Sequence, residues 1–337
     1  MMKMFKILFL NTLVIGTLIA ISSYSWMGMW IGLEINLLSI IPLMSSNKIS
    51  YSSESSLKYF MTQSLASTIF LFSIIMMYMN LDIIPMSKST YMMMMNFSLL
   101  TKMGAAPFHF WFPEIMNGLD WFNSFLILTW QKIAPMMILF TNLYSLKLMY
   151  IVILSSMIIG GVMGLNQMSI RKILAYSSIN HMGWMLAALM TNFFTWLIYF
   201  TIYSLISLML IIMFHNSSIM NFNQLILNQK FNTMEKFSIN LNLLSMGGLP
   251  PFLGFFPKWL VINQLSENKM ITILIFMVLL TLITLFYYIR LIISSLSLNY
   301  TQISFQMNLN NLSFIFYFTN FLNLLGLMIM ILLFKYI

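Results

Sequence analysis

The chain contains no cysteine, only 7% charged residues and three histidines among its 337 residues. Without cysteine it cannot form disulfides, thiolate metal sites or iron–sulfur ligation of its own. The histidines are too few and too scattered to predict a haem or metal cluster. Neither G-x-G-x-x-G nor G-x-x-x-x-G-K-[ST] occurs, so the sequence predicts no nucleotide site. We therefore expect no cofactor in this chain, and any redox chemistry linked to it must take place elsewhere.

Apolar residues make up 60% of the chain, and the mean hydropathy is +0.90. Soluble domains carry about 25% charged residues, so this composition indicates a protein whose solvent is lipid. The net charge of +9 then favours positive loops on one membrane face over nucleic-acid binding. Abundant Met (36) and Phe (30), with only two Arg, are typical of an AT-rich animal mitochondrial genome. We interpret the chain as organelle-encoded.

Apolar segments long enough to span a membrane, which requires ~20 residues, occur eleven times. The first follows Lys3 and Lys6 like a signal peptide, but ten more segments come after it, so we interpret it as a retained helix. The predicted fold class is an all-α polytopic membrane protein with about 11 transmembrane helices. The expected spans are 5–23, 25–44, 57–79, 89–112, 121–141, 147–166, 171–190, 193–215, 237–265, 270–295 and 312–335.

Positive charges between these segments predict the orientation. Nine Lys and Arg residues fall on the side of the N-terminus and four on the other side. The more positive side is the inside, so we expect the N-terminus in the matrix of a mitochondrion. With eleven spans, the C-terminus would face the intermembrane space, and the localisation would be the mitochondrial inner membrane.

A ten-residue pattern occurs twice, 144 positions apart: GAAPFHFWFP at 104–113 and GLPPFLGFFP at 248–257. Both fit G-x-x-P-F-x-x-x-F-P, and both interrupt an apolar segment. Proline cannot donate a backbone hydrogen bond and clashes with the preceding turn, so each pattern predicts a broken helix. Freed backbone groups need protein or water partners, which predicts a polar cavity at each break; a simple packing kink is the alternative. The expected break residues are Gly104, Pro107, Pro113, Gly248, Pro251 and Pro257.

The two breaks fall in the fourth and ninth expected helices, five helices apart. Because five is odd, the two copies must have opposite topology, which predicts inverted repeats of the kind found in transporters. We expect a first repeat at 1–145, a second at 146–296, and a loop with a C-terminal helix at 297–337, all in one membrane domain.

Four charged residues fall inside the expected spans: Glu34, Lys102, Lys132 and Lys258. Each costs ~2.5–3.5 kcal/mol at the centre of a membrane, and such residues mark ion paths or proton relays. Burial favours neutral lysine, and a nearby carboxylate favours charged lysine. A Glu34–Lys102 pair would hold a proton on Lys102, and breaking the pair would release it toward Lys132. For Lys258, an alternative is that its side chain extends to the membrane surface.

His181 lies on one helical face with Ser177 and Ser178, an arrangement that can hold water and carry protons. Hydrogen bonding between helices is the alternative. His109, inside the first break, is a weaker candidate. Tyr59 and Tyr199 are expected to face lipid or to serve in packing.

The runs WIGLEINLLSIIPL, SLKYFMTQSLAS, KMGAAPFHFWFPE, TWQKIAP, GLNQMSIRKILAYSSINHMGWM and GGLPPFLGFFPKW cover nearly the whole chain. They resemble the subunit 2 family of mitochondrial NADH:ubiquinone oxidoreductase, respiratory complex I, and more distantly the wider group of antiporter-like proton-pumping subunits. The resemblance implies fourteen spans in larger members, with the first three absent in animals. It carries the relay roles over to Glu34, Lys102, Lys132, His181 and Lys258.

The resemblance further implies a membrane-arm subunit of an enzyme complex, with neighbouring antiporter-like subunits and inner-membrane lipids as partners and no nucleic acid. NADH, FMN, iron–sulfur clusters and ubiquinone are then expected in partner subunits, whose electron transfer would drive proton movement here. Two alternatives stay open. One is an autonomous cation/proton antiporter, and the other is a structural membrane subunit with a vestigial channel.

Overall fold

A computed structural model of the chain describes residues 4–45, 50–79, 88–143, 146–217, 219–222, 224 and 233–297, with six further residues between 320 and 328. Within these residues every regular element is a helix, and the only β pairing is an isolated bridge between Ser169 and Asn221. The predicted all-α fold is confirmed. Most of the helix expected at 312–335 lies outside the described residues.

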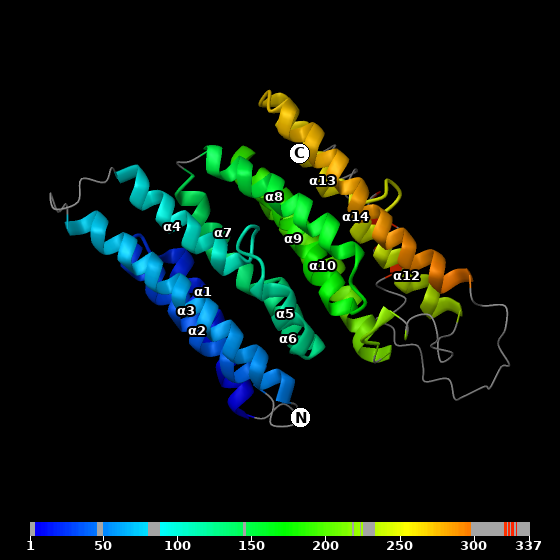
Figure 1. Cartoon of the computed structure of the whole chain (residues 1–337), viewed down its shortest axis with the longest axis horizontal. Helices are drawn as coiled ribbons and strands as arrows, with labels where there is room; N and C mark the ends of the chain where they lie inside the picture. The colour runs from blue at the N-terminus through cyan, green and yellow to red at the C-terminus, as the bar shows by residue number, and fades with distance from the viewer. Residues whose placement is uncertain are drawn as a thin grey trace. The chain divides into compact units, whose positions relative to one another are not determined.

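The described residues divide into two compact units, Met1–Ser155 and Ser156–Ile337. Helix α8, Leu146–Leu165, carries the boundary between them. The first unit contains α1 to α7 (Figure 1), with the bounds Met4–Ser22, Trp26–Met44, Ser50–Met79, Lys88–Met103, Trp111–Gly118, Trp121–Leu128 and Trp130–Thr141. The second contains α9, α10, α12, α13 and α14, with the bounds Ile170–Thr191, Phe193–Ser217, Thr233–Gly247, Phe255–Glu267 and Ile271–Ser297.

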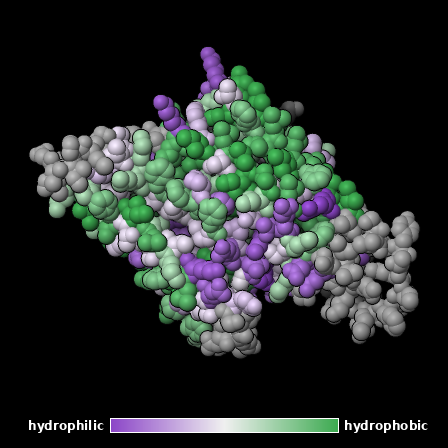
Figure 2. All heavy atoms as spheres, in the orientation of Figure 1, coloured by the Kyte–Doolittle hydropathy of each residue, from purple (hydrophilic) through white to green (hydrophobic). Residues whose placement is uncertain are grey.

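Seven helices in the described part of the chain are long and apolar enough to cross a membrane. They include α1, α2, α3, α8, α10 and α14, together with the consecutive pair α6–α7 at Trp121–Thr141. Apolar side chains are exposed over much of the face drawn in Figure 2, as expected for a surface solvated by lipid. The expected spans 89–112 and 237–265 are divided between shorter helices, α4 with α5 and α12 with α13.

Small residues allow helices of one unit to approach closely. A Cβ on Gly32 of α2 would meet the backbone nitrogen of Ala20 in α1 at 2.5 Å, and one on Gly16 would meet Asn36 at 2.6 Å. In the second unit, a Cβ on Gly160 would meet the backbone of α9 at 2.7 Å. Close contact of this kind is how helices associate where no hydrophobic effect drives them together.

Helix α9 forms the core of the second unit. Nearly all of its residues from Ile170 to Leu189 are buried, including Ser177, Ser178 and His181. Helices α10, α13 and α14 pack against it. A polar helix buried in this way contributes side chains to the interior of its unit rather than to lipid.

Candidate proton-transfer site

Both repeated motifs break a helix in the same register. Helix α4 ends at Met103 and α5 begins at Trp111; 144 positions later, α12 ends at Gly247 and α13 begins at Phe255. The first glycine of each motif has a positive φ, 71° at Gly104 and 78° at Gly248. Only glycine adopts this conformation without strain, so the repeated glycine sets where each helix stops.

The backbone hydrogen bonds across the two breaks also correspond. Ala105 donates to the carbonyl of Leu100 at 3.1 Å, and Leu249 donates to that of Leu244 at 3.4 Å. Later in each break, the N–H of Phe112 bonds to His109, and the N–H of Phe256 bonds to Leu253. The repeat seen in the sequence is therefore a repeat of backbone structure.

The four repeated prolines occupy two kinds of position. Pro113 and Pro257 are buried in the first turns of α5 and α13, where a missing N–H costs no helical bond. Pro107 and Pro251 are exposed in the non-helical residues between the half-helices. All six predicted break residues thus lie at the breaks or in the turn that follows them.

In the first unit, Lys102 lies in the last turn of α4 and is 6% exposed. Glu34 of α2 is half-buried, and its Oε2 is buried without a partner among the described residues. No direct ion pair joins Glu34 to Lys102 in the described part of the chain.

A small polar cavity adjoins Lys102. It is lined by Asn36 and Leu37 of α2, Tyr59 and Gln63 of α3, Lys102 of α4, and Gln131 of α7, with Leu33 and Pro135 completing the wall. Gln63 donates from Nε2 to the carbonyl of Lys102 at 3.3 Å, and Tyr59 donates to Oε1 of Gln131 at 3.1 Å. The wall thus combines one ionisable group with several hydrogen-bonding groups.

Lys132 lies in α7 and is 1% exposed. Its Nζ lies 5.3 Å from the centre of the Phe112 ring, within the range of a cation–π interaction. Phe112 belongs to α5, so this contact links Lys132 to the half-helix that follows the first break. Lys132 is not among the residues that line the cavity beside Lys102.

In the second unit, Lys258 lies in the first turn of α13 and is 6% exposed. Its ammonium group donates to the carbonyl of Gly247 at 2.8 Å. This carbonyl ends α12, where the helix dipole favours a cation. Lys258 therefore bridges the two half-helices of the second break, and its side chain does not extend to the surface.

His181 also meets a cavity. Its Nδ1 lies 2.8 Å from the hydroxyl of Tyr199, and its ring lies 5.1 Å from that of Tyr203. The cavity is lined by these three residues of α9 and α10 together with Ser245, Met246, Gly254 and Pro257 at the second break, and by Ile202 and Ile206. Tyr59 and Tyr199 were expected to face lipid or to serve in packing. Both are buried and do not face lipid, and each also lies within hydrogen-bond distance of a polar group, Gln131 or His181.

Three lining positions are equivalent in the two cavities under the 144-residue repeat. They are Leu37 and His181, Tyr59 and Tyr203, and Lys102 and Met246. Each cavity therefore has a tyrosine at an equivalent position, whereas its basic side chain, Lys102 or His181, occupies a different position in each. The cavity beside the first break is mainly polar, whereas the one beside the second break is mainly apolar.

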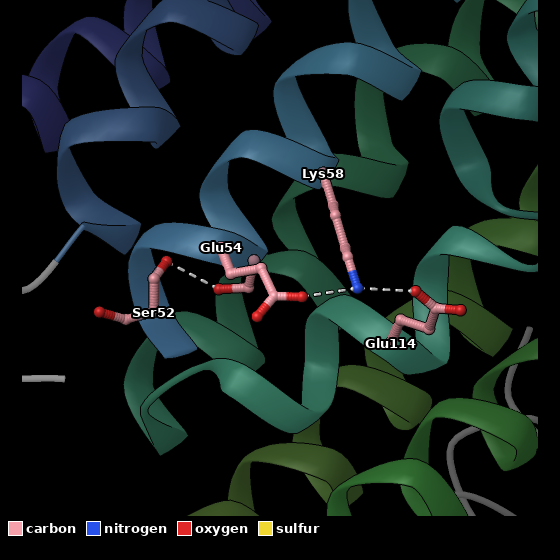
Figure 3. Close-up of polar contacts among 5 residues, drawn as sticks. Ser52, Glu54, Lys58 and Glu114 are labelled. Atoms are coloured by element: carbon pink, nitrogen blue, oxygen red, sulfur yellow. Dashed lines mark hydrogen bonds and ion pairs between the residues drawn. The ribbon is translucent and has the colours of Figure 1, made fainter. Parts of the chain in front are cut away.

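The ion pairs among the described residues lie elsewhere. Lys58 of α3 contacts Glu54 and Glu114, each at 3.0 Å (Figure 3). Glu114 lies in α5, so Lys58 ties this half-helix to α3, a role that sequence reasoning missed. The described residues contain no group of three or more His, Asp or Glu side chains suited to a metal ion.

Known proteins match this chain along most of its length. A family model described as NADH:quinone oxidoreductase/Mrp antiporter, transmembrane, covers residues 23–284. NADH-ubiquinone oxidoreductase chain 2 of Anopheles gambiae is 50% identical over 332 residues, which are 97% of this chain and 97% of that protein.

Two solved structures share the fold. A chain of respiratory complex I from Thermus thermophilus with bound aureothin is 22% identical, with a TM-score of 0.84, over 97% of this chain and 78% of that one. A chain of the Mrp complex from Dietzia sp. DQ12-45-1b is 16% identical, with a TM-score of 0.74, over 85% of this chain and 59% of that one. The chain belongs to the NADH-ubiquinone oxidoreductase chain 2 family, within the NADH:quinone oxidoreductase and Mrp antiporter transmembrane proteins.

Proposed function

We propose that this chain is a core membrane-arm subunit of mitochondrial complex I and that it translocates protons across the inner membrane. The observation that carries the proposal is that a small cavity lies beside each broken helix, lined by the buried side chain of Lys102 in the first unit and of His181 in the second. Charges buried at membrane depth are costly, and their retention favours a role in ion transfer over a structural one.

The relay we propose uses Glu34, Lys102 and Lys132 in the first unit and His181 and Lys258 in the second. Glu34 controls the proton on Lys102 through its charge, and Lys102 passes the proton toward Lys132. His181 and Lys258 act at the second break. The N-terminus faces the matrix and the C-terminus the intermembrane space, in accord with the distribution of Lys and Arg along the chain.

Energy for this transfer comes from other subunits. Moving one charge against 100 mV requires ~2.3 kcal/mol, and this chain has no motif for a redox or nucleotide cofactor that could supply it. In this proposal, partner subunits hold NADH, FMN, iron–sulfur clusters and ubiquinone, and electron transfer there drives the relay in this chain. The enzyme activity is thus that of the whole complex.

An autonomous cation/proton antiporter is the rival function, because the family also includes Mrp antiporters. Such a protein needs a carboxylate ion site near a broken helix. Glu34 is the only acidic residue deep in a predicted span, and its helix, α2, is unbroken. A single carboxylate of this kind suits the control of a lysine better than coordination of a metal cation.

The test is the substitution Lys132→Met in the assembled complex, with NADH-driven proton transport measured in sealed vesicles. Transport should fall by roughly ten-fold or more, since positioned proton-transfer groups contribute ~10²–10⁴-fold to rates. The exposed Lys147 at the start of α8 provides the control, and Lys147→Met should leave transport unchanged. Normal proton transport by a fully assembled Lys132→Met complex would refute the relay.

A further inference from the structure

Tyr59 makes two contacts that join the cavity of the first unit to its surroundings. It lies in α3, is 2% exposed, and donates its hydroxyl to Oε1 of Gln131 in α7. Its ring lies edge-on to Trp111, the first residue of α5, at 5.9 Å between centroids. One side chain therefore connects the half-helix after the break with the helix that carries Lys132.

Gln131 is left with an unused donor. Its Oε1 accepts from Tyr59, while its Nε2 is buried and has no partner among the described residues. Pro135, one turn later, lacks the N–H that would bond to the Gln131 carbonyl in a regular helix. Gln131, Pro135 and Lys102 all line the same cavity. Buried polar groups are almost always satisfied, so these groups point to water in this cavity.

The Tyr59 hydroxyl fixes which end of the Gln131 amide is free. With Oε1 accepting from Tyr59, the free end of the amide is Nε2, which can only donate, as can a protonated Lys102. A water between them accepts from both, and its own hydrogens then point away from Lys102. If the amide were free to turn, Oε1 could instead accept directly from the Lys102 ammonium and hold its proton in place.

We propose that Tyr59 is a positioning residue for proton transfer at Lys102, acting through the orientation of the Gln131 amide. In the transfer step, Nζ of Lys102 gives its proton to the water oxygen. One of the water's own protons then leaves toward Lys132, the next base of the proposed relay, which lies in α7 outside this cavity. No net charge remains on the water.

The equivalent residue of the second unit supports this role. Tyr203 lies 144 positions after Tyr59, lines the cavity of its own unit, and contacts the ring of His181 at 5.1 Å. A tyrosine thus stands beside the ionisable group of each cavity, at the same position of the repeat. Packing alone would not require a hydroxyl at both positions.

The inference rests on the proposed function, and Tyr59→Phe in the assembled complex tests it. The substitution keeps the ring against Trp111 and removes the hydroxyl. NADH-driven proton transport should slow by about five-fold, the effect of one lost hydrogen bond, and the solvent deuterium isotope effect on transport should rise. Tyr91→Phe is the control, because Tyr91 is a buried tyrosine of α4 that does not line the cavity.

Gln131→Met completes a double-mutant cycle, because Tyr59 is proposed to act only through Gln131. Gln131→Met alone should reproduce the slower transport, and adding Tyr59→Phe should slow it no further. Additive losses, or an unchanged rate and isotope effect in either single variant, would overturn the inference. Lys102→Met separates the two proposals. If it stops transport while Tyr59→Phe changes nothing, only this inference fails; if it transports normally, the relay itself fails.

Discussion

At the scale of single residues, burial distinguishes two acidic groups, Glu34 and Glu114. Glu34 is half-buried and has a buried oxygen without a partner among the described residues. Glu114 is exposed and takes part in an ion pair with Lys58. Exposed pairs contribute little because water and salt screen them.

This contrast predicts different outcomes for the same substitution. Glu34→Gln removes the charge that favours a proton on Lys102, so NADH-driven proton transport by the assembled complex should fall by about ten-fold. Glu114→Gln keeps the size of the side chain and should change transport little. The measurement is proton transport per complex, normalised to the amount assembled on a native gel. Equal effects of the two substitutions would contradict the role of Glu34.

At the scale of elements, the two broken helices show how a short motif specifies a local structure. Gly104 and Gly248 both adopt positive φ, and the helices on either side stop and resume at equivalent residues. The second break is more constrained than the first, because a Cβ on Gly248 would lie 2.7 Å from Nζ of Lys258. At Gly104 the nearest atom would lie at 3.2 Å.

Replacement of these glycines by alanine should destabilise the breaks to different extents. Both alanines must adopt a left-handed conformation, which costs ~1–2 kcal/mol, and Gly248→Ala also displaces the Lys258 ammonium from the Gly247 carbonyl. The inactivation temperature of the complex should fall by a few degrees, and further for Gly248→Ala than for Gly104→Ala. Gly247→Ala is the control, since its Cβ would have only an ordinary contact at 3.6 Å. If Gly247→Ala lowered the inactivation temperature as much as Gly248→Ala, this explanation would be contradicted.

Local features of the fold could be predicted from the sequence, whereas contacts between helices could not. The repeated Gly and Pro residues indicate both breaks, because their backbone restrictions act within a few positions. The hydroxyl of Tyr59 gives no such signal, since its partner Gln131 is 72 positions away in another helix. For the same reason the sequence left two interpretations of Lys258 open. Its contact with the Gly247 carbonyl depends on how the two half-helices are arranged, which the sequence alone does not show.

At the scale of the whole molecule, the chain combines two broken helices with buried ionisable groups, and its sequence has no motif for a redox or nucleotide cofactor. Each unit has a broken helix, a cavity and a buried ionisable side chain. Proton movement against a membrane potential still requires energy from outside the chain. The account therefore requires that the protein work inside a larger complex that oxidises NADH.

The most direct measurement of this claim is native-gel separation of mildly solubilised inner membranes, probed for this chain and stained for NADH dehydrogenase activity. The account predicts that the chain migrates in one very large particle that carries the activity. A small separate band without that activity would contradict the account and favour an autonomous antiporter.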